Sequence, residues 1–332
     1  MAFSGAAAAD GPPKIYLLHE NDAWVAPLCA ALADLGLPYE AWFLDEGRLD
    51  LAAPPPEGVF YSRMSASAHT RGHRHAAALA RAVLGWLEAH DRRVINGTRA
   101  LALELSKAAQ HLALAQAGIR TPRTAAAVGR DEVLALSDDF GGGPYILKPN
   151  RGGKGLGVRL LPGRAALADY LAGPGAGEDA PIDGIWLLQE YVRPVEPFIT
   201  RCEFVGGRFL YALRVDTSGG FALCPADACA IEDLACPVGG GPAKFAIQPA
   251  FDHPLLARFE RFLADNRIEV AGLEFITDAA GDAFTYDVNV NTNYNAEAER
   301  AAGVSVTGMQ AVARFLGQAL ARPGDAGEAA AE

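Results

Sequence analysis

A glycine-rich turn flanked by lysines is the segment whose residues most clearly suggest chemistry. Lys148 ends an apolar run that begins at Tyr145, and Arg151 opens a turn that contains Lys154. The glycines of this turn are Gly152, Gly153, Gly155 and Gly157. Because glycine adopts positive φ without steric cost, such a turn can bring backbone N–H groups close to an anion, and the lysines add positive charge. The pattern indicates either a loop folded over a polyphosphate or a strand end followed by a glycine hairpin turn.

Two common phosphate-binding loops do not fit this turn. A Walker A loop has Ser or Thr after its lysine, whereas Lys154 is followed by Gly155. Protein kinases place their lysine after the glycine loop, whereas Lys148 precedes this one, and no His-Arg-Asp or Asp-Phe-Gly segment follows the loop. A lysine strand followed by a glycine loop therefore points to another nucleotide fold.

Two carboxylates and an amide form a second candidate group, in a hairpin predicted between Gly272–Thr277 and Ala283–Val290. Period-two alternation predicts that four side chains face the core: Phe284, Tyr286, Val288 and Val290. The other face is predicted to carry Thr285, Asp287 and Asn289. The turn brings Glu274 opposite Asp287, and like charges so close are costly unless a cation lies between them. Oxygen ligands favour Mg²⁺ or Mn²⁺ over zinc; otherwise these residues form the polar outer face of an exposed hairpin.

Two arginines form a third candidate group, in a hairpin predicted from the two-glycine turn between Thr200–Val205 and Arg208–Val215. Counting back from the turn places Arg201 and Arg214 on one face of the sheet, where two guanidinium groups could clamp a phosphate or a carboxylate. Arg201 could equally pair with Glu203, which the alternation puts on the same face.

A polar loop follows the predicted strand Val59–Tyr61 of an open α/β unit. Ligands usually bind beyond the carboxyl ends of such strands. The residues of this loop that could contact a substrate are Arg63, Ser65, His69 and Arg71. The loop is either a substrate-facing segment or a solvated basic turn before a helix.

Composition places the chain among ordinary globular proteins. Its 332 residues are 50% hydrophobic and 21% charged, and 29 basic against 40 acidic residues give a net charge of −11. This balance argues against nucleic acid as a partner, although a local cationic pocket can still bind a nucleotide. No apolar run is long enough for a membrane helix, and five cysteines without an export signal predict reduced thiols in the cytoplasm. The spacing of Cys224, Cys229 and Cys236 matches no zinc pattern.

The chain is expected to form three folded parts between loose ends. Residues 1–13 are predicted to be a disordered lead, and residues 322–332 a flexible tail. Residues 14–98 are predicted as the open α/β domain. Residues 99–191 are predicted as a central part with the lysine strand and the glycine loop, and residues 192–321 as a C-terminal part with the carboxylate hairpin.

Two further features complete an ordered series. Leu101–Ala117 is predicted as one helix with Lys107 in its middle, and Ile185–Val192 as a buried strand that ends in polar groups. The order of lysine helix, lysine strand, glycine loop, Gln-Glu-Tyr-Val strand end and Asp-x-Asn hairpin resembles the ATP-grasp superfamily, most closely its RimK-like glutamate-ligase branch. The resemblance runs from about Asn96 to Gly317. It implies an α/β (α+β) ATP-grasp fold with an N-terminal open α/β (pre-ATP-grasp) domain.

The resemblance also implies roles for individual residues. Those that would contact the phosphates of ATP are Lys107, Lys148 and the mobile loop Arg151–Gly157. Those that would bind adenine are Gln189, Glu190, Tyr191 and Val192, with Glu196 as the ribose-binding acid. The Mg²⁺ ligands would be Glu274, Asp287 and Asn289. The catalytic charges on the transferring group would come from Arg201, Arg214 and Lys148.

The chain departs from the family where substrate would lie. Ile199 replaces an acid two residues before Arg201, so the ribose contact is assigned to Glu196 instead. Segments around Cys224 and after Asn289 also differ. The residues considered as substrate contacts are therefore Arg63, Ser65, His69, Arg71, Cys224, Asp227, Asn291 and Asn293. Cationic side chains among them suggest a substrate with a carboxylate beyond the one that is activated.

The expected activity is that of an ATP- and Mg²⁺-dependent carboxylate–amine ligase, which forms an amide through an acyl phosphate. Amino acids or peptides are the expected substrates, and a homodimer is a possible assembly. The alternatives are an ATP-grasp phosphotransferase without an amine acceptor, or a nucleotide-binding partner protein without catalytic activity. The intact set of metal ligands argues against the last alternative.

Overall fold

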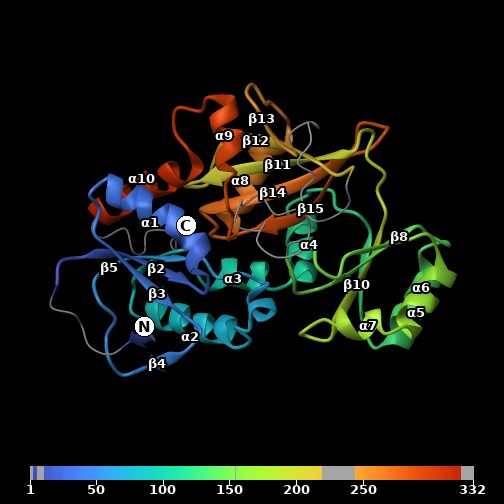
Figure 1. Cartoon of the computed structure of the whole chain (residues 1–332), viewed down its shortest axis with the longest axis horizontal. Helices are drawn as coiled ribbons and strands as arrows, with labels where there is room; N and C mark the ends of the chain where they lie inside the picture. Colours follow the sequence, from blue (N-terminus) through green and yellow to red (C-terminus); the bar gives the residue numbers. More distant parts are fainter. Residues whose placement is uncertain (1–2, 6–10, 154, 219–243, 323–332) are drawn as a thin grey trace.

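The structure is a computed structural model of the 332-residue chain, and it describes residues 3–5, 11–153, 155–218 and 244–322. Three larger sheets and their helices make up the molecule. In Figure 1 the N-terminal sheet lies at the lower left, the C-terminal sheet above it and the central sheet to the right. Within the described residues, no helix has the length and apolar character needed to cross a membrane.

Four parallel strands build the N-terminal sheet in the order β3-β2-β5-β6. Their bounds are Lys14–His19 for β2, Tyr39–Phe43 for β3, Gly58–Ser62 for β5 and Arg93–Ile95 for β6. Helix α2 (Ala76–Ala89) packs on one face, while α1 (Asp22–Asp34) and α10 (Gly308–Ala321) pack on the other. Helices on both faces explain why β2 and β5 are almost continuously apolar.

The central sheet consists of four antiparallel strands in the order β7-β10-β8-β9. Their bounds are Thr124–Val128 for β7, Tyr145–Pro149 for β8, Arg159–Leu161 for β9 and Ile185–Glu190 for β10. The helices on this sheet are α5 (Arg130–Asp139), α6 (Arg164–Ala172) and α7 (Gly175–Glu178). These elements enclose a hydrophobic core of their own, in which Leu147 and Leu188 pack with Leu167. The lysine strand of the sequence is therefore an inner strand of a separate small core.

Five antiparallel strands form the C-terminal sheet in the order β13-β12-β11-β14-β15. Their bounds are Phe198–Val205 for β11, Arg208–Asp216 for β12, Phe245–Gln248 for β13, Val270–Thr277 for β14 and Ala283–Asn289 for β15. Helix α8 (Leu255–Asp265) covers one face, and α10 lies against the other. Helix α9 (Ala296–Ala302) follows β15 and is capped by Asn295.

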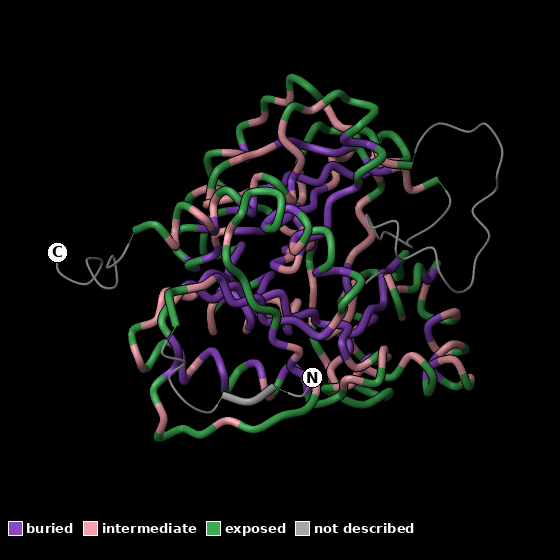
Figure 2. Tube along the Cα trace, turned by 60° about the vertical axis from the view of Figure 1, so that its left-hand side comes forward, coloured by how far each residue is buried: buried purple, intermediate pink, exposed green. Residues whose placement is uncertain are grey.

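The N-terminal and C-terminal sheets share one hydrophobic core. Leu17 of β2, Leu28 of α1, Leu213 of β12 and Leu316 of α10 belong to the same buried cluster. Figure 2 shows the buried stretches running through the middle of the molecule, with exposed stretches at its edges. The central sheet lies outside this joint core and has a hydrophobic cluster of its own.

Two expectations about the first half of the chain need correction. Within the lead predicted to be disordered, a strand β1 (Phe3–Gly5) pairs in parallel with β4 (Gly47–Leu49). The single helix predicted over residues 101–117 is two helices, α3 (Thr98–Glu104) and α4 (Lys107–Gln116). The Ser106 side chain accepts a hydrogen bond from the Ala109 backbone at 3.2 Å and starts a new helix there.

The break moves both helices and their lysine. Lys107 is the first residue of α4 rather than the middle of a long helix. Leu103 of α3 and Leu114 of α4 pack in the core of the C-terminal sheet. The expected tail lies, from residue 323 on, outside the described residues.

A register shift in the first hairpin separates the two arginines predicted to form a clamp. Counting from the glycine turn would put Arg201 opposite Ala212, but a bulge after Glu203 shifts the pairing, and Arg201 lies opposite Leu213. Arg214 lies opposite Thr200, which points to the other face of the sheet from Arg201. The predicted clamp is therefore wrong.

A second bulge changes the faces of the carboxylate hairpin. Glu274 does lie opposite Asp287, as predicted, but Phe275 pairs with Thr285, which leaves Tyr286 as an extra residue between the two pairs. Thr285 is consequently buried in the core, while Tyr286 turns to the same side as Asp287. The predicted core position of Tyr286 and outer position of Thr285 are both corrected.

Candidate active site

A cleft between the central and C-terminal sheets brings most of the sequence-predicted residues together. The glycine loop and β8 form one wall, β14 and β15 form the other, and α4 lies at one end. The predicted residues that line it are Lys107, Lys148, Gly152, Gly153, Gly155, Gln189, Tyr191, Val192, Glu274, Asp287 and Asn289. Their convergence joins segments that are distant in the sequence into one site.

The glycine loop approaches β8 closely. A Cβ atom at Gly152 or at Gly157 would lie 3.2 Å from the Pro149 ring, and Gly157 has a φ of +71°. Side chains at these positions would therefore push the loop away from the strand or strain its backbone. Lys154 lies outside the described residues.

The two lysines of the cleft differ in their charge balance. The Lys148 side chain is buried, and burial together with the neighbouring Lys107 lowers the pKa of Lys148 to about 7. For Lys107, burial favours the neutral form, but the Asp287 carboxylate with which it pairs, together with Glu104 and Glu274, raises its pKa. Among the described residues no carboxylate forms an ion pair with Lys148. A bound anion would supply the missing negative charge.

Glu274, Asp287 and Asn289 face one another across β14 and β15. Burial raises the pKa of Glu274, against the opposing effect of Arg201, whereas the Lys107 ammonium outweighs burial and lowers the pKa of Asp287. Glu274 accepts hydrogen bonds from the Tyr286 hydroxyl at 2.9 Å and from the Asn289 amide nitrogen at 3.4 Å. These contacts place the Tyr286 hydroxyl and the Asn289 amide group beside the Glu274 carboxylate.

These donors fit a hard divalent cation. Of the described residues, no three His, Cys, Asp or Glu side chains come together as a metal site, so a cation here would take two carboxylates and the Asn289 amide oxygen. A set made only of oxygen atoms suits Mg²⁺ or Mn²⁺, which usually keep several water ligands. The residues therefore fit the expected Mg²⁺.

Arg201 is held in a buried network rather than pointing freely into the cleft. Its Nε donates to Glu203 at 2.6 Å, Nη1 to Glu274 at 2.7 Å, and Nη2 to the Thr292 hydroxyl at 2.6 Å. Thr292 in turn donates to Glu203 at 2.8 Å. The pairing with Glu203, which the sequence left open, is thus present, and Glu203 and Glu274 raise the pKa of Arg201 despite its burial.

Several predicted residues lie outside the lining of the cleft. Arg214 pairs with Glu196 at 2.6 Å and stacks on the Phe198 ring at 3.7 Å, with about half of the Arg214 side chain exposed. Glu190 accepts a hydrogen bond from the Arg123 backbone at 2.7 Å. Arg151 donates to the backbone carbonyl of Ala66 at 3.3 Å, so the glycine loop reaches the N-terminal domain.

A smaller polar chamber adjoins the cleft. It shares Lys107, Gly152, Gly153, Asp287 and Asn289 with the cleft and is also lined by Arg201. Of the predicted substrate residues, Ser65, Asn291 and Asn293 line this chamber. The segment that contains Cys224 and Asp227 lies outside the described residues.

Two of the three basic residues of the predicted substrate loop, Arg63 and Arg71, bind other parts of the protein. Arg63 is buried and donates hydrogen bonds to the segment around Asn293. Arg71 pairs with the buried Glu20 at 2.5 Å and lies over the Trp24 ring at 4.7 Å. Burial and the nearby Arg151 lower the pKa of His69, which favours its neutral form. Arg71 is therefore neutralised by Glu20, whereas the hydrogen bonds of Arg63 within the described residues go to neutral groups.

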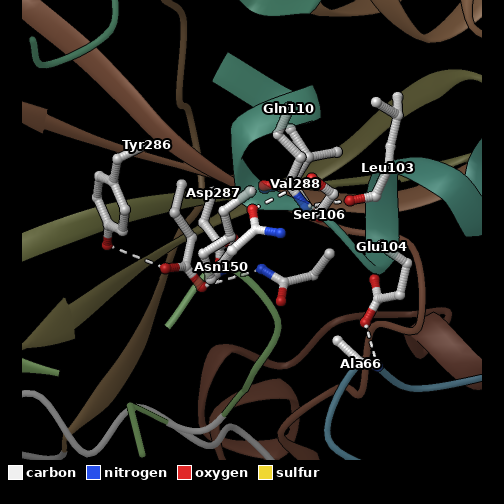
Figure 3. Close-up of polar contacts among 12 residues, drawn as sticks. Ala66, Leu103, Glu104, Ser106, Gln110, Asn150, Tyr286, Asp287 and Val288 are labelled. Atoms are coloured by element: carbon white, nitrogen blue, oxygen red, sulfur yellow. Dashed lines mark hydrogen bonds and ion pairs between the residues drawn. The ribbon is translucent and has the colours of Figure 1, made fainter. Parts of the chain in front are cut away.

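Sequence reasoning missed the residues that hold Lys107 beside the predicted metal ligands. Gln110 donates to the carbonyls of Leu103 at 2.9 Å and Val288 at 2.8 Å, and Glu104 accepts from the Val290 backbone at 2.9 Å. Figure 3 shows Gln110 close to Val288 and the Glu104 carboxylate directed at Ala66. Gln110 thus attaches α4 to β15, and Glu104 attaches α3 to the residue that follows β15. Polar residues within helices carry no sequence signal for such contacts, and the position of Tyr286 depended on the bulge.

Comparison with known proteins agrees with this architecture, although no family model matches the chain. The chain is 30% identical over 126 residues to a probable alpha-L-glutamate ligase 2 of Pseudoalteromonas atlantica. The matched stretch covers 38% of this chain and 40% of that protein. The chain thus spans about two fifths of that relative's length.

Solved structures match over most of the chain. A RimK domain ATP-grasp protein from Sphaerobacter thermophilus has a TM-score of 0.62 at 18% identity, covering 91% of this chain and 98% of that one. The ATP-grasp ligase PsnB, complexed with a phosphomimetic variant of its minimal precursor, Mg and ADP, has a TM-score of 0.60 at 16% identity, covering 94% of this chain and 99% of that one. The predicted fold class is confirmed: this chain has the ATP-grasp fold, with partial sequence similarity to the alpha-L-glutamate ligases.

Proposed function

We propose that the protein is an ATP- and Mg²⁺-dependent carboxylate–amine ligase. A substrate carboxylate oxygen would attack the γ-phosphorus of ATP with loss of ADP, and an amine would then displace phosphate from the acyl phosphate and lose a proton. The observation that carries the proposal is the convergence of Lys107, Lys148, the glycine loop and the Glu274–Asp287–Asn289 set on one cleft. Relatives named as glutamate ligases support it.

The cleft offers distinct surroundings for the two ends of a nucleotide. At one end, Ile146, Ile276 and Val192 provide apolar contacts for a flat base. Gln189 lines this end, and its buried side-chain oxygen has no hydrogen-bond partner among the described residues. An amino group on the base could satisfy that oxygen. At the other end, the two lysines and the loop N–H groups would bind phosphates.

Glu274, Asp287 and Asn289 would hold Mg²⁺ at the phosphate end. When bound, Mg²⁺ neutralises negative charge on the phosphates. Lys107 would stabilise charge on the transferring group, and Arg201 would keep Glu274 oriented through its hydrogen bond. The Arg151 contact with Ala66 would help the glycine loop exclude water from an acyl phosphate, which hydrolyses readily.

Phosphate release from ATP tests this function. With a panel of amino acids and small peptides, turnover should require both a carboxylate and an amine. Turnover with a carboxylate alone would instead favour a phosphotransferase on the same fold. Amino acid or peptide substrates, as well as a homodimer, remain part of the proposal.

The metal site gives a second test of the same function. Asp287→Asn should lower turnover by at least about a hundredfold, because a carboxylate that would hold Mg²⁺ beside the phosphates is lost. The fold should be retained, which circular dichroism checks, but the melting temperature should fall because Lys107 loses the carboxylate with which it pairs. Normal turnover of this variant at saturating Mg²⁺ would remove the hairpin from the active site.

A further inference from the structure

Arg63 is a buried arginine that binds the side-chain amides of Asn291 and Asn293 through their oxygen atoms. It is only 3% exposed. Its Nε donates to the Asn291 side-chain oxygen at 3.1 Å and its Nη2 to the Asn293 side-chain oxygen at 2.7 Å. Nη2 also donates to the Thr292 carbonyl at 3.0 Å, so Arg63 holds three consecutive residues.

The hydrogen-bonding chemistry of arginine fixes how the two amide groups are oriented. A guanidinium group has five N–H donors and no acceptor, so each amide must present its oxygen to Arg63. The amide nitrogen of each side chain is then turned the other way. Both residues line the polar chamber, Asn293 is 7% exposed, and no acceptor for either amide nitrogen is found in the described part of the chain.

The other charged groups of the chamber are already paired. Glu104 accepts from the backbone N–H groups of Ala66 and Val290, and Asp287 pairs with Lys107. Arg201 is neutralised by Glu203 and Glu274. Apart from the groups assigned to Mg²⁺, the amide nitrogens of Asn291 and Asn293 are therefore donors that remain open to a ligand.

We infer that Asn291 and Asn293 are specificity-determining donors that bind a carboxylate of the substrate, and that Arg63 is the positioning residue that fixes their orientation. The inference rests on the proposed function, because the chamber adjoins the cleft assigned to ATP. It also changes the role expected of Arg63, which acts through the two amides instead of meeting the substrate. At the two amide nitrogens a protonated amine would meet donors, so this end of the chamber favours a carboxylate over an ammonium group.

Three small probes of similar shape test the preference: N-acetylglycine, N-acetylglycinamide and N-acetylethylenediamine, which end in a carboxylate, an amide and an ammonium group. Ligand-observed NMR titrations with the full chain and MgADP should show the carboxylate binding best and the ammonium compound worst. Equal binding of the three probes, a preference for the ammonium compound, or no binding of the carboxylate would overturn the inference.

Asn293→Asp is the sharpest variant. The new carboxylate still accepts from Arg63, but an oxygen replaces the donor that faces the chamber. Binding of N-acetylglycine should weaken by about tenfold or more, as a charge-assisted hydrogen bond is replaced by repulsion. Asn295→Asp is the matched control, because Asn295 caps α9 by accepting from the Ala298 backbone at 2.7 Å, and the same change of charge preserves that cap. Binding of N-acetylglycine that is unchanged in Asn293→Asp, or equally weakened in both variants, contradicts the assignment.

Arg63→Lys tests the positioning role. A lysine keeps the positive charge but cannot hold both amides with one rigid fork, so the preference for carboxylate over amide probe should fall. An unchanged preference would show that Arg63 does not orient the amides. Calorimetry of MgADP with the wild type separates the two hypotheses. Absent nucleotide binding would refute the proposed function, whereas normal nucleotide binding without carboxylate preference would refute only this inference.

Discussion

At the scale of single residues, the site is defined by which charges are compensated and which are not. Lys107 has Asp287, and Arg201 has Glu203 and Glu274, so these charges are paired before any ligand arrives. Lys148 is buried and has no such partner within the described residues. Burying a charge without a partner is costly, and the low pKa of Lys148 is the result.

Nucleotide binding should therefore be coupled to protonation of Lys148. Its pKa of about 7 leaves the lysine mostly neutral at pH 8, and phosphate groups would favour the charged form. Binding of ATP at pH 8 should take up close to one proton, and affinity should fall as the pH rises above 7. Calorimetry in two buffers with different ionisation enthalpies measures this uptake.

Lys148→Arg provides the control, because an arginine stays charged throughout this pH range. The variant should bind ATP without proton uptake at pH 8. If the wild type shows no uptake, or if the arginine variant shows the same uptake, Lys148 is not the group that becomes protonated.

Gly272 is required by the position of Arg201. A Cβ atom at residue 272 would lie 2.6 Å from Nη2 and 2.8 Å from Nε of Arg201. Gly272→Ala should therefore displace the guanidinium group from its carboxylates and destabilise the protein by about 1–3 kcal/mol. Denaturant unfolding measures the change.

The same substitution in a helix is a suitable control. Gly85 lies in α2, and nothing is within 4 Å of a Cβ atom built there. Gly85→Ala should stabilise the protein by up to about 1 kcal/mol, because alanine favours the helix. A Gly272→Ala variant as stable as the wild type would mean that Arg201 has room to move.

At the scale of elements, a bulge in a strand and a break between two helices determine where side chains of the cleft point. The bulge in β15 turns Tyr286 toward Glu274, and the break at Ser106 places Lys107 at the start of a helix opposite Asp287. Asn150, at the end of β8, accepts hydrogen bonds from Ser106 at 3.1 Å and from the Ala108 backbone at 2.9 Å. These contacts connect the lysine strand of the central sheet to α4.

The glycine loop is expected to become ordered when nucleotide binds. Its glycines impose a large conformational entropy cost, which contacts with phosphates would offset. Amide hydrogen exchange of a peptide covering Arg151–Gly157 should slow markedly with Mg²⁺ and a non-hydrolysable ATP analogue. Equal exchange with and without the analogue would argue against a lid, and the α2 helix serves as an internal reference that should not change.

At the scale of the whole molecule, the division of the hydrophobic core explains how the cleft could open. The N-terminal and C-terminal sheets share one core, whereas the central sheet has its own. The cleft lies between these two bodies. Movement of the central part would therefore change the cleft without disturbing the joint core.

Core substitutions should reveal this division. Leu171→Ala in the central core and Leu316→Ala in the joint core should each cost about 2–5 kcal/mol. Hydrogen exchange should accelerate only in the central sheet for the first variant, and in both the N-terminal and C-terminal sheets for the second. Uniform acceleration in both variants would show that the chain unfolds as one unit.

The sequence alone determined the features that depend on neighbouring residues. The lysine strand followed by a glycine loop was visible in residues 145–157, because apolar runs and glycines act locally. The pairing of Glu274 with Asp287 followed from a short turn that closes a hairpin. The order of these motifs was enough to predict the ATP-grasp fold, which the solved structures confirm.

Tertiary structure decided what distant residues do to one another. Arg201 and Arg214 point to opposite faces because a bulge shifts one strand by a residue, and a one-residue shift reverses every following side chain. Arg63 and Asn293 are 230 positions apart in the sequence. The residues next to Arg63 therefore could not show that its guanidinium group donates to two amides. Bulges and buried polar contacts arise from packing between segments far apart in the chain, and only the folded structure brings those segments together.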